Sequence, residues 1–244
     1  MTNDIFLTII IPAYNEEKTI KGTLFEIAEY LKRKEFGCEV MVVDDGSNDR
    51  TEATARSVAG IFANFRLLSY GGNRGKGYAV KSGMSAAKGK YALFMDADNS
   101  TSISELDKFL PYFKEGYDVV IASRRLKESL VEEKQPFLRA KMGRFYIFLS
   151  KVLLGLDLSD FNCGFKMYNV NNAGFIFGLQ RMDDWSFDVE LLFLANKYGL
   201  KIKEVPVRWV HKSGSKVKPF SDAVRSFFSL VKIKVNDIND KYKR

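Results

Sequence analysis

The sequence is poor in residues that cross-link a chain or bind transition metals. Two cysteines, Cys38 and Cys163, and one histidine, His211, are present in 244 residues. The cysteines lie far apart without the spacing of a metal site, which argues against a disulfide scaffold and favours a reducing, cytosolic compartment. We interpret both cysteines as small hydrophobic residues.

Linkers, repeats and long apolar runs are also missing. Only five prolines occur and no Gly/Ser-rich or Pro-rich linker divides the chain, and no repeat of about twenty to fifty residues is visible. We therefore predict one domain over residues 1–244. No apolar run approaches the roughly 20 residues that cross a bilayer. Because no run is long enough to span, we expect any membrane contact to be peripheral. The first residues also lack the basic start and cleavage site of a signal peptide.

The positive charge is confined to one end of the chain. The net charge is +8, and residues 201–244 hold 12 Lys/Arg against 4 Asp/Glu, which leaves residues 1–200 neutral. A basic end can bind nucleic acid or anionic lipid, or only add solubility. No motif that reads nucleic acid is present, so we predict no nucleic-acid partner.

Apolar runs rich in β-branched residues alternate with stretches of helical periodicity. Runs such as Leu7–Ile11 are typical of strands covered on both faces in a mainly parallel sheet. The alternation predicts an α/β fold with a doubly wound sheet, in which ligands bind at the carboxyl ends of the strands. The expected strands are 7–11, 40–43, 65–69, 91–95 and 118–122, and the expected helices are 15–37, 51–59, 76–87 and 102–113, the last with a capping box of Ser102 and Glu105.

Three polar clusters follow these strands. Residues 44–47 (Asp-Asp-Gly-Ser) can take hydrogen bonds from a base or ribose, although an ordinary turn also explains them. Residues 71–77 offer backbone amides and cations to phosphate oxygens, but also fit a plain surface loop. Asp96 and Asp98 would point the same way if their strand continues, and Mg²⁺ or Mn²⁺ would offset their repulsion. Solvated turn aspartates are the alternative reading.

A series of short motifs runs in order along nearly the whole chain. Together they resemble family 2 glycosyltransferases of the GT-A fold, and within that family the dolichyl-phosphate glucose and mannose synthases. The resemblance implies a Rossmann-like mixed sheet with helices on both faces. The motifs are Pro12–Glu16 (PAYNE), Asp44–Ser47 (DDGS), Asn73–Gly77 (NRGKG), Asp96–Asp98 (DAD), Ala122–Arg124 (ASR), Asp160–Lys166 (DFNCGFK), Trp185–Glu190 (WSFDVE), Glu204–Trp209 (EVPVRW) and Gly214–Val217 (GSKV).

The resemblance also implies roles for individual residues. Asp96 and Asp98 would hold Mg²⁺ or Mn²⁺ on the donor's diphosphate and, with Arg124, form the catalytic set. Some mannose synthases carry Gln two positions after the second Asp, whereas this chain has Ser100 there, which favours UDP-glucose over GDP-mannose as donor. The residues expected to bind the nucleotide are Pro12, Tyr14, Glu16, Asp44, Asp45, Lys76, Asp96 and Ala97.

The acceptor implied by the resemblance is a polyprenyl phosphate. Its oxygen is already anionic near neutral pH, so it can displace the diphosphate in one inverting step without a general base. Arg124, Arg139 and Arg144 are expected to hold the acceptor phosphate, because guanidinium groups bind such oxyanions in pairs of hydrogen bonds. For Arg144 and Arg125 an ordinary surface role remains an alternative.

Two segments mix large apolar residues with Lys and Arg. Residues 136–156 and the tail around residues 224–235 are too charged to span a bilayer, and an interfacial amphipathic helix accounts for both features. A core helix is the alternative for residues 136–156. We therefore expect a nucleotide-sugar half of about 1–123, an acceptor and membrane-facing half of about 124–244, and a peripheral position on the cytoplasmic inner face of a membrane.

Three residues are left with open roles. Asp188 and Glu190 open a helical stretch, where a structural cap and an acceptor-side role are both reasonable. His211 could approach the metal or the diphosphate, or simply lie at the surface. A glycosyltransferase with a saccharide or protein acceptor and a non-catalytic basic lipid- or nucleic-acid-binding module are the alternative functions. The sequence leaves the oligomeric state open.

Overall fold

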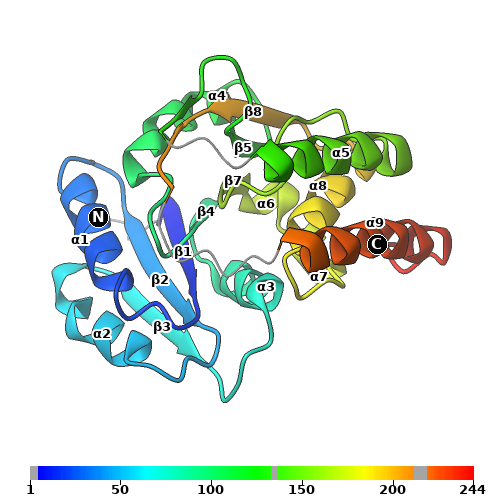
Figure 1. Ribbon diagram of the computed structural model, residues 1–244. Helices are drawn as coiled ribbons and strands as arrows, with labels where there is room; N and C mark the ends of the chain where they lie inside the picture. Colours follow the sequence, from blue (N-terminus) through cyan, green and yellow to red (C-terminus); the bar gives the residue numbers. More distant parts are fainter. Residues whose placement is uncertain (1–4, 133–136, 212–218) are drawn as a thin grey trace.

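The computed structural model describes residues 5–132, 137–211 and 219–244, and it has a seven-stranded mixed sheet at its centre (Figure 1). Six strands share one direction, and β7 runs antiparallel to both of its neighbours, β4 and β5. In spatial order the strands are β3 (Phe65–Ser69), β2 (Cys38–Asp44), β1 (Leu7–Ala13), β4 (Tyr91–Met95), β7 (Phe165–Asn169), β5 (Val119–Ser123) and β8 (Ile202–Pro206).

Helices cover both faces of this sheet, as the sequence predicts. One face packs on α1 (Ile20–Leu31), α2 (Thr51–Ser57), the 3₁₀ helix η2 (Ile103–Lys108) and α4 (Leu110–Lys114). The other packs on α3 (Lys76–Ala86), α6 (Val170–Ala173), α7 (Phe175–Leu179), α8 (Phe187–Lys197) and the ends of α5 (Phe137–Leu154) and α9 (Pro219–Ile238). The short 3₁₀ helix η1 (Ala59–Ile61) follows α2, and β6 (Leu130–Val131) pairs with β9 (Arg208–Trp209) in a separate small sheet.

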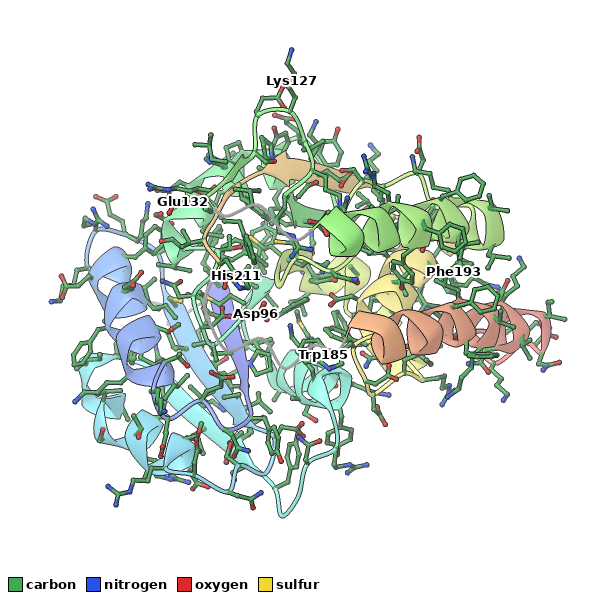
Figure 2. All side chains as sticks on the ribbon, in the orientation of Figure 1. Asp96, Lys127, Glu132, Trp185, Phe193 and His211 are labelled. Atoms are coloured by element: carbon green, nitrogen blue, oxygen red, sulfur yellow. The ribbon has the colours of Figure 1, made fainter. Side chains whose placement is uncertain are left out.

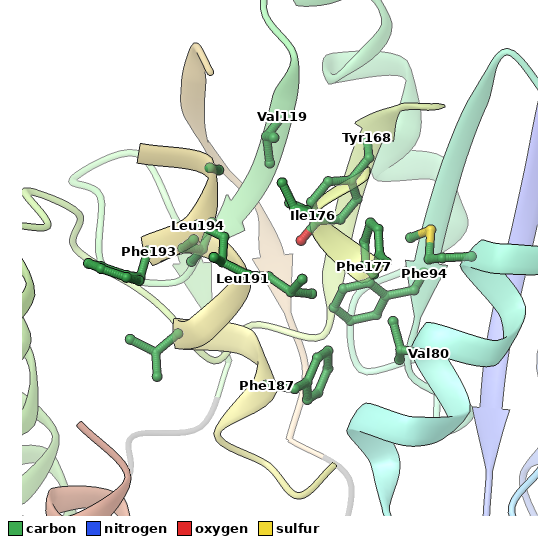
Figure 3. Close-up of a cluster of buried hydrophobic side chains, with 14 of the residues drawn as sticks. Val80, Phe94, Val119, Tyr168, Ile176, Phe177, Phe187, Leu191, Phe193 and Leu194 are labelled. Atoms are coloured by element: carbon green, nitrogen blue, oxygen red, sulfur yellow. The ribbon is translucent and has the colours of Figure 1, made fainter. Parts of the chain in front are cut away.

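Alternate residues of the strands enter two separate cores. Ile9 and Ile11 of β1 face α1, whereas Ile10 between them faces α3 and is packed with Phe94 of β4. Figure 3 shows the second core, where Phe94, Phe177 and Phe187 lie together between the sheet and α8. Both faces of β1, β2, β4 and β5 are buried, which explains why the sequences of these strands read as nearly continuous apolar runs.

Two expectations about local structure are wrong. Asn15 does not start a helix: it has φ of 54°, and α1 begins only at Ile20 after a turn. Asn tolerates this left-handed conformation better than most residues, so it suits a turn. The segment after Ser102 forms η2 and then α4 rather than one helix; Ser102 caps it, but Glu105 pairs with Lys108 instead of closing a capping box.

The helices α5 and α9 contact each other, and each of them has a stripe of apolar side chains that is exposed to solvent. Phe145, Phe148 and Val152 are exposed on α5, three and four residues apart, so they share one side of the helix. On α9 the exposed residues Phe228, Val231, Val235 and Ile238 repeat with the same spacing. Over the part of the chain that the structure describes, no helix is both long and apolar enough to cross a membrane.

Candidate active site

Asp45, at the end of β2, organises the loop that precedes α3. Its buried carboxylate accepts hydrogen bonds from the Tyr70 hydroxyl (2.8 Å), the Asn73 side-chain amide (2.9 Å) and the backbone N–H groups of Arg74 and Gly75 (both 2.9 Å). All four partners belong to residues 70–75, so the side chain holds the loop in one shape. If Asp45 also contacts the nucleotide, as the sequence predicts, its carboxylate must do so while it keeps these four hydrogen bonds.

The ends of β1 and β2 are joined by hydrogen bonds around the other expected nucleotide-binding residues. Asp44 is buried next to Ser47, which donates to it, and Ser47 also accepts from the N–H of Asn15 (2.9 Å). The N–H of Glu16 donates to the Thr51 hydroxyl (2.7 Å). Pro12 is buried, while Tyr14 and Glu16 are half-buried. The structure therefore brings the first two motifs together at the carboxyl edge of the sheet.

Lys76, at the start of α3, points at the acidic turn. Its Nζ lies 2.5 Å from Oδ1 of Asp96. Burial alone would lower the pKa of Lys76, but Asp96, Asp188 and Asp98 outweigh burial and raise it. The turn before α3 is fixed, because the N–H of Gly77 donates to the carbonyl of Asp183 (2.7 Å).

The acidic motif forms a turn and does not continue the strand. Strand β4 ends at Met95, so the period-two argument for parallel carboxylates is wrong. The N–H of Asn99 donates to the carbonyl of Asp96 (3.2 Å), and Asn99 has φ of 55°. The buried carbonyl of Ala97 accepts from Thr23 (2.7 Å), and Asp98 accepts from the N–H of Ser100 (2.9 Å). These bonds place both carboxylates at the same edge of the sheet.

The two carboxylates repel each other and fit a divalent cation. Burial, and next the negative charge of Asp96, raise the pKa of Asp98 above its ordinary value. A cation between the two groups would remove this penalty. Within the described ranges no third Asp, Glu, His or Cys joins them as a possible ligand. Mg²⁺ and Mn²⁺ sites commonly use one or two carboxylates and take their other oxygens from substrate phosphates and water, so the residues present fit such an ion.

Arg124 lies just after β5 and is held by Asp160. Its backbone N–H (3.0 Å), Nε (2.7 Å) and Nη2 (2.8 Å) all donate to the Asp160 carboxylate. Burial would raise the pKa of Asp160, but Arg124 outweighs burial and lowers it to about 2. The guanidinium also lies 5.5 Å from the ring centre of Trp209. The N–H of Asp96 donates to the carbonyl of Gly164 (3.0 Å), four residues after Asp160, so Arg124 and the acidic turn are held by the same segment of the chain.

The other expected acceptor-binding arginines lie on α5. Arg144 is exposed. The pKa of Arg125 is lowered, mainly by burial and in addition by the positive charges of Arg124 and Arg144. A Cβ atom on Gly143 would meet the Arg125 guanidinium at 2.4 Å, so Arg125 packs directly against α5. The side chain of Arg139 lies outside the described residues. Arg124, Arg125 and Arg144 therefore make one positive region beside the sheet edge.

Asp188 and Glu190 are both buried in the first turns of α8, with different partners. Asp188 accepts from Nζ of Lys166 (2.6 Å), and both side chains are inaccessible to solvent. Glu190 accepts from the N–H groups of Arg181 (3.0 Å) and Met182 (2.8 Å) and from the Tyr242 hydroxyl (2.5 Å). Both carboxylates thus make structural contacts that the sequence left undecided.

His211 lies on the segment that runs beside the acidic turn. The N–H of Val210 donates to the carbonyl of Ser100 (2.9 Å), and the imidazole packs on the Trp209 ring at 5.7 Å. Figure 2 shows His211 and Asp96 near the middle of the molecule. The histidine is half-buried, and in the described part of the chain it does not join other His, Cys, Asp or Glu side chains in a group of three that could hold a metal ion.

Several residues of the site were missed by sequence reasoning. Asp160 fixes Arg124, and a Cβ atom on Gly164 would come within 1.9 Å of Asp96 Oδ2, so only glycine leaves room for that carboxylate. Lys166 neutralises Asp188. All three belong to the motif 160–166, for which the resemblance alone specifies no role. This motif leads into β7, and the position of β7 between β4 and β5 brings the motif to the site.

Comparisons with known proteins agree with this geometry. The model of glycosyl transferase family 2 matches residues 8–174. A dolichyl-phosphate β-glucosyltransferase of Dictyostelium discoideum is 35% identical over 248 residues, covering 95% of this chain and 75% of the relative. The human dolichyl-phosphate β-glucosyltransferase is 31% identical over 228 residues, covering 88% of this chain and 70% of the relative.

Solved structures show the same fold. Mannosyl-3-phosphoglycerate synthase from Rubrobacter xylanophilus superposes with a TM-score of 0.72 at 18% identity, covering 97% of this chain and 75% of that one. Glucosyl-3-phosphoglycerate synthase from Mycobacterium tuberculosis, solved with Mn²⁺, UDP-glucose and phosphoglyceric acid, superposes with a TM-score of 0.67 at 18% identity, covering 95% and 80%. The fold is therefore that of GT-A glycosyltransferases, as expected. Together with the family match and the curated relatives, this identifies the chain as a glycosyltransferase that belongs to glycosyl transferase family 2.

Proposed function

We propose that this chain transfers glucose from UDP-glucose to a polyprenyl phosphate at a membrane surface, with inversion at the anomeric carbon. The observation that carries the proposal is the surrounding of Asp96: Lys76 contacts it at 2.5 Å, and the segment 160–166, which packs on Asp96 through Gly164, also holds Arg124 through Asp160. One cation suits a donor diphosphate and the other an acceptor phosphate. Relatives named as dolichyl-phosphate β-glucosyltransferases support the choice of sugar and acceptor.

Residues at the ends of β1, β2 and β4 form the proposed donor side. We assign Pro12, Tyr14, Glu16 and Asp44 to the nucleotide and Lys76 to the diphosphate. Asp96 and Asp98 would hold Mg²⁺ or Mn²⁺, which, when bound, neutralises negative charge on the leaving diphosphate. Mn²⁺ and UDP-glucose occur together in a structure of the same fold, which supports a divalent cofactor.

Arg124 is the proposed contact of the acceptor phosphate. Two of its N–H groups are occupied by Asp160, so the guanidinium is held in one orientation. A fixed cation can place the acceptor oxyanion in line with the bond that breaks, and such positioning lowers the barrier without proton transfer. Arg144 would add positive charge at the rim, and Arg139 on the same helix keeps its expected role as a proposal.

The described residues argue against a hydroxyl acceptor. A saccharide or protein acceptor would need a base to remove a proton during attack. Asp188, for which the sequence leaves an acceptor-side role open, is buried and paired with Lys166 at 2.6 Å, so it is not placed to act as that base. A phosphate acceptor needs no base, because its oxygen is ionised already.

The exposed stripes of α5 and α9 support a peripheral membrane position. Lys232 and Lys234 are exposed near the apolar stripe of α9, and such residues attract anionic headgroups by about 1 kcal/mol each. We propose that these helices meet the inner, cytoplasmic face of the membrane. The division into a nucleotide-sugar half, 1–123, and an acceptor half, 124–244, belongs to the same proposal.

A transfer assay tests this function. The protein, Mg²⁺ or Mn²⁺ and polyprenyl phosphate in vesicles are incubated with radiolabelled UDP-glucose and, separately, GDP-mannose. We expect labelled lipid from UDP-glucose. Labelled lipid from GDP-mannose alone would correct the donor, and absence of labelled lipid with either donor would contradict the proposal.

A further inference from the structure

Trp185 is a large apolar side chain left in solvent beside the site. It is 60% exposed. The other exposed aromatic side chains of the described residues lie on the helices α1, α5 and α9, whereas Trp185 lies on the loop before α8. A single exposed apolar side chain is common on a protein surface, but this indole lies next to Lys76 of the candidate site, where its apolar face is available to a ligand.

The loop holds this indole in place. The carbonyl of Asp183 accepts from Gly77, and the N–H of Ser186 donates to the Asp184 carboxylate (2.9 Å). Phe187, two residues on, is fully buried, and a Cβ atom on Gly77 would come within 2.7 Å of its Cβ. The loop therefore packs directly on the start of α3, and its conformation sets the exposure of Trp185.

One side chain joins the indole to the acidic turn. Nζ of Lys76 lies 5.0 Å from the centre of the Trp185 ring and 2.5 Å from Asp96. If Lys76 contacts the donor's diphosphate, the ring lies about one side-chain width from that diphosphate. The nucleoside is assigned to residues at the ends of β1 and β2, so the group on the diphosphate that is left to meet the ring is the hexose. Trp185 and Asp96 both lie near the middle of the molecule in Figure 2.

We propose that Trp185 is the contact surface for the hexose of the nucleotide sugar, with the indole against the C–H face of the sugar ring. A hexose has a face of C–H bonds and an edge of hydroxyls, and an aromatic ring suits that face while the hydroxyls keep polar partners. This inference rests on the proposed function. A prenyl chain is the less suitable occupant, because the apolar stripes of α5 and α9 already offer a surface for lipid.

Calorimetric titration of UDP and UDP-glucose, each with Mn²⁺, tests the inference. Trp185→Ala should weaken UDP-glucose binding about 10-fold and change UDP binding less than about 2-fold, whereas Trp185→Phe should stay within about 3-fold of the parent protein for both. Phe25→Ala removes an aromatic residue of similar exposure from α1 and should change neither affinity. The thermal midpoint of each variant reports whether it folds.

Each other outcome overturns the inference in a distinguishable way. An equal loss for UDP and UDP-glucose would mean that the indole only positions Lys76. If Trp185→Ala raises the KM for polyprenyl phosphate and leaves the UDP-glucose affinity unchanged, the ring contacts the lipid and not the hexose. If the parent protein binds UDP-glucose and glucosylates lipid, and Trp185→Ala has the same affinity and activity, only the inference about Trp185 is wrong. A parent protein that does neither would remove the proposed function as well.

Discussion

Asp96 and Asp98 are two residues apart, yet they meet different neighbours. Asp96 contacts Lys76 and packs on Gly164, whereas Asp98 accepts one backbone hydrogen bond, from Ser100. The fold around the turn depends on the carbonyl of Ala97, which Thr23 holds. Asp98 is therefore the carboxylate that can be changed with the least structural effect.

Asp98→Asn should abolish most of the activity and leave the fold intact. We expect turnover to fall at least about 100-fold, because a neutral amide is a poor ligand for Mg²⁺ or Mn²⁺. The thermal midpoint without metal should not fall, since the repulsion from Asp96 is removed. Turnover and midpoint are measured together. Asp157→Asn, which changes an exposed surface carboxylate, is the control, and a variant at position 98 that keeps a tenth of the activity would contradict the metal role.

The Arg124–Asp160 pair gives a pH dependence with a defined sign. Burial opposes ionisation of Asp160, but Arg124 lowers its pKa from 3.8 to about 2 in the folded chain. Because the pKa of Asp160 is lower in the folded chain than in the unfolded chain, the pair stabilises the fold fully when the pH is above the ordinary pKa of 3.8. This contribution is lost as the pH falls from about 4 through 2, and it amounts to about 2 kcal/mol when complete.

Urea denaturation of the parent protein and Asp160→Asn between pH 7 and 2 measures this contribution. The variant should unfold at lower urea concentration at pH 7, and the difference should shrink as the pH falls below 4. A difference that stays constant down to pH 2 would show that the loss comes from packing and not from the charge of Asp160.

At the scale of elements, five of the six parallel strands of the sheet were predicted, whereas the parallel strand β8, which contains Lys203 and Glu204, and the antiparallel strand β7 were not. Strands β1, β2, β4 and β5 are buried on both faces, so their apolar composition alone identifies them. Strand β7 carries Lys166, whose charge is buried only because Asp188 comes from another element. Such a pairing is invisible in a local window. The turn at Asn15–Thr19 was missed for a similar reason, since its bonds go to Ser47, Asp49 and Thr51.

The apolar stripe of α9 should determine membrane binding. Phe228 is 63% exposed, and transfer of a Phe side chain from water to an apolar phase is worth about 1.5–3 kcal/mol. Phe228→Ser should therefore weaken binding to anionic vesicles about 10-fold or more. Vesicle co-sedimentation measures this affinity. Phe25→Ser on α1 is the matched control and should bind like the parent protein; equal loss in both variants would contradict a role specific to α9.

At the scale of the whole molecule, the site is assembled from segments far apart in the chain. The motifs at residues 12–16, 44–47, 73–77, 96–98 and 122–124 predicted the carboxyl edge of the sheet correctly, because each lies at the end of a parallel strand or after it. Their mutual distances depend on the strand order, which places 160–166 next to 96–98 and could not be read from the sequence. The contacts of Gly164 with Asp96 and of Asp160 with Arg124 follow from that order alone.

The C-terminal segment is attached to α8 by the buried hydroxyl of Tyr242. Tyr242 is fully buried and donates to Glu190 at 2.5 Å, while Glu190 also accepts from the loop at Arg181 and Met182. The same loop holds Asp183 against Gly77, at the start of the helix that carries the donor-side lysine. The end of the chain is thus connected to the donor side by a short series of hydrogen bonds.

Removing that hydroxyl should lower stability by about 1–3 kcal/mol, because Glu190 would remain buried with one acceptor position unpaired. Urea denaturation of Tyr242→Phe measures the loss. Tyr168→Phe is a matched control: this tyrosine is equally buried, but its hydroxyl has no hydrogen-bond partner among the described residues. The control should be neutral or slightly stabilising, since it removes an unpaired polar group. If both variants lose the same stability, the loss comes from packing around a tyrosine ring and the hydrogen bond to Glu190 does not hold the C-terminal segment.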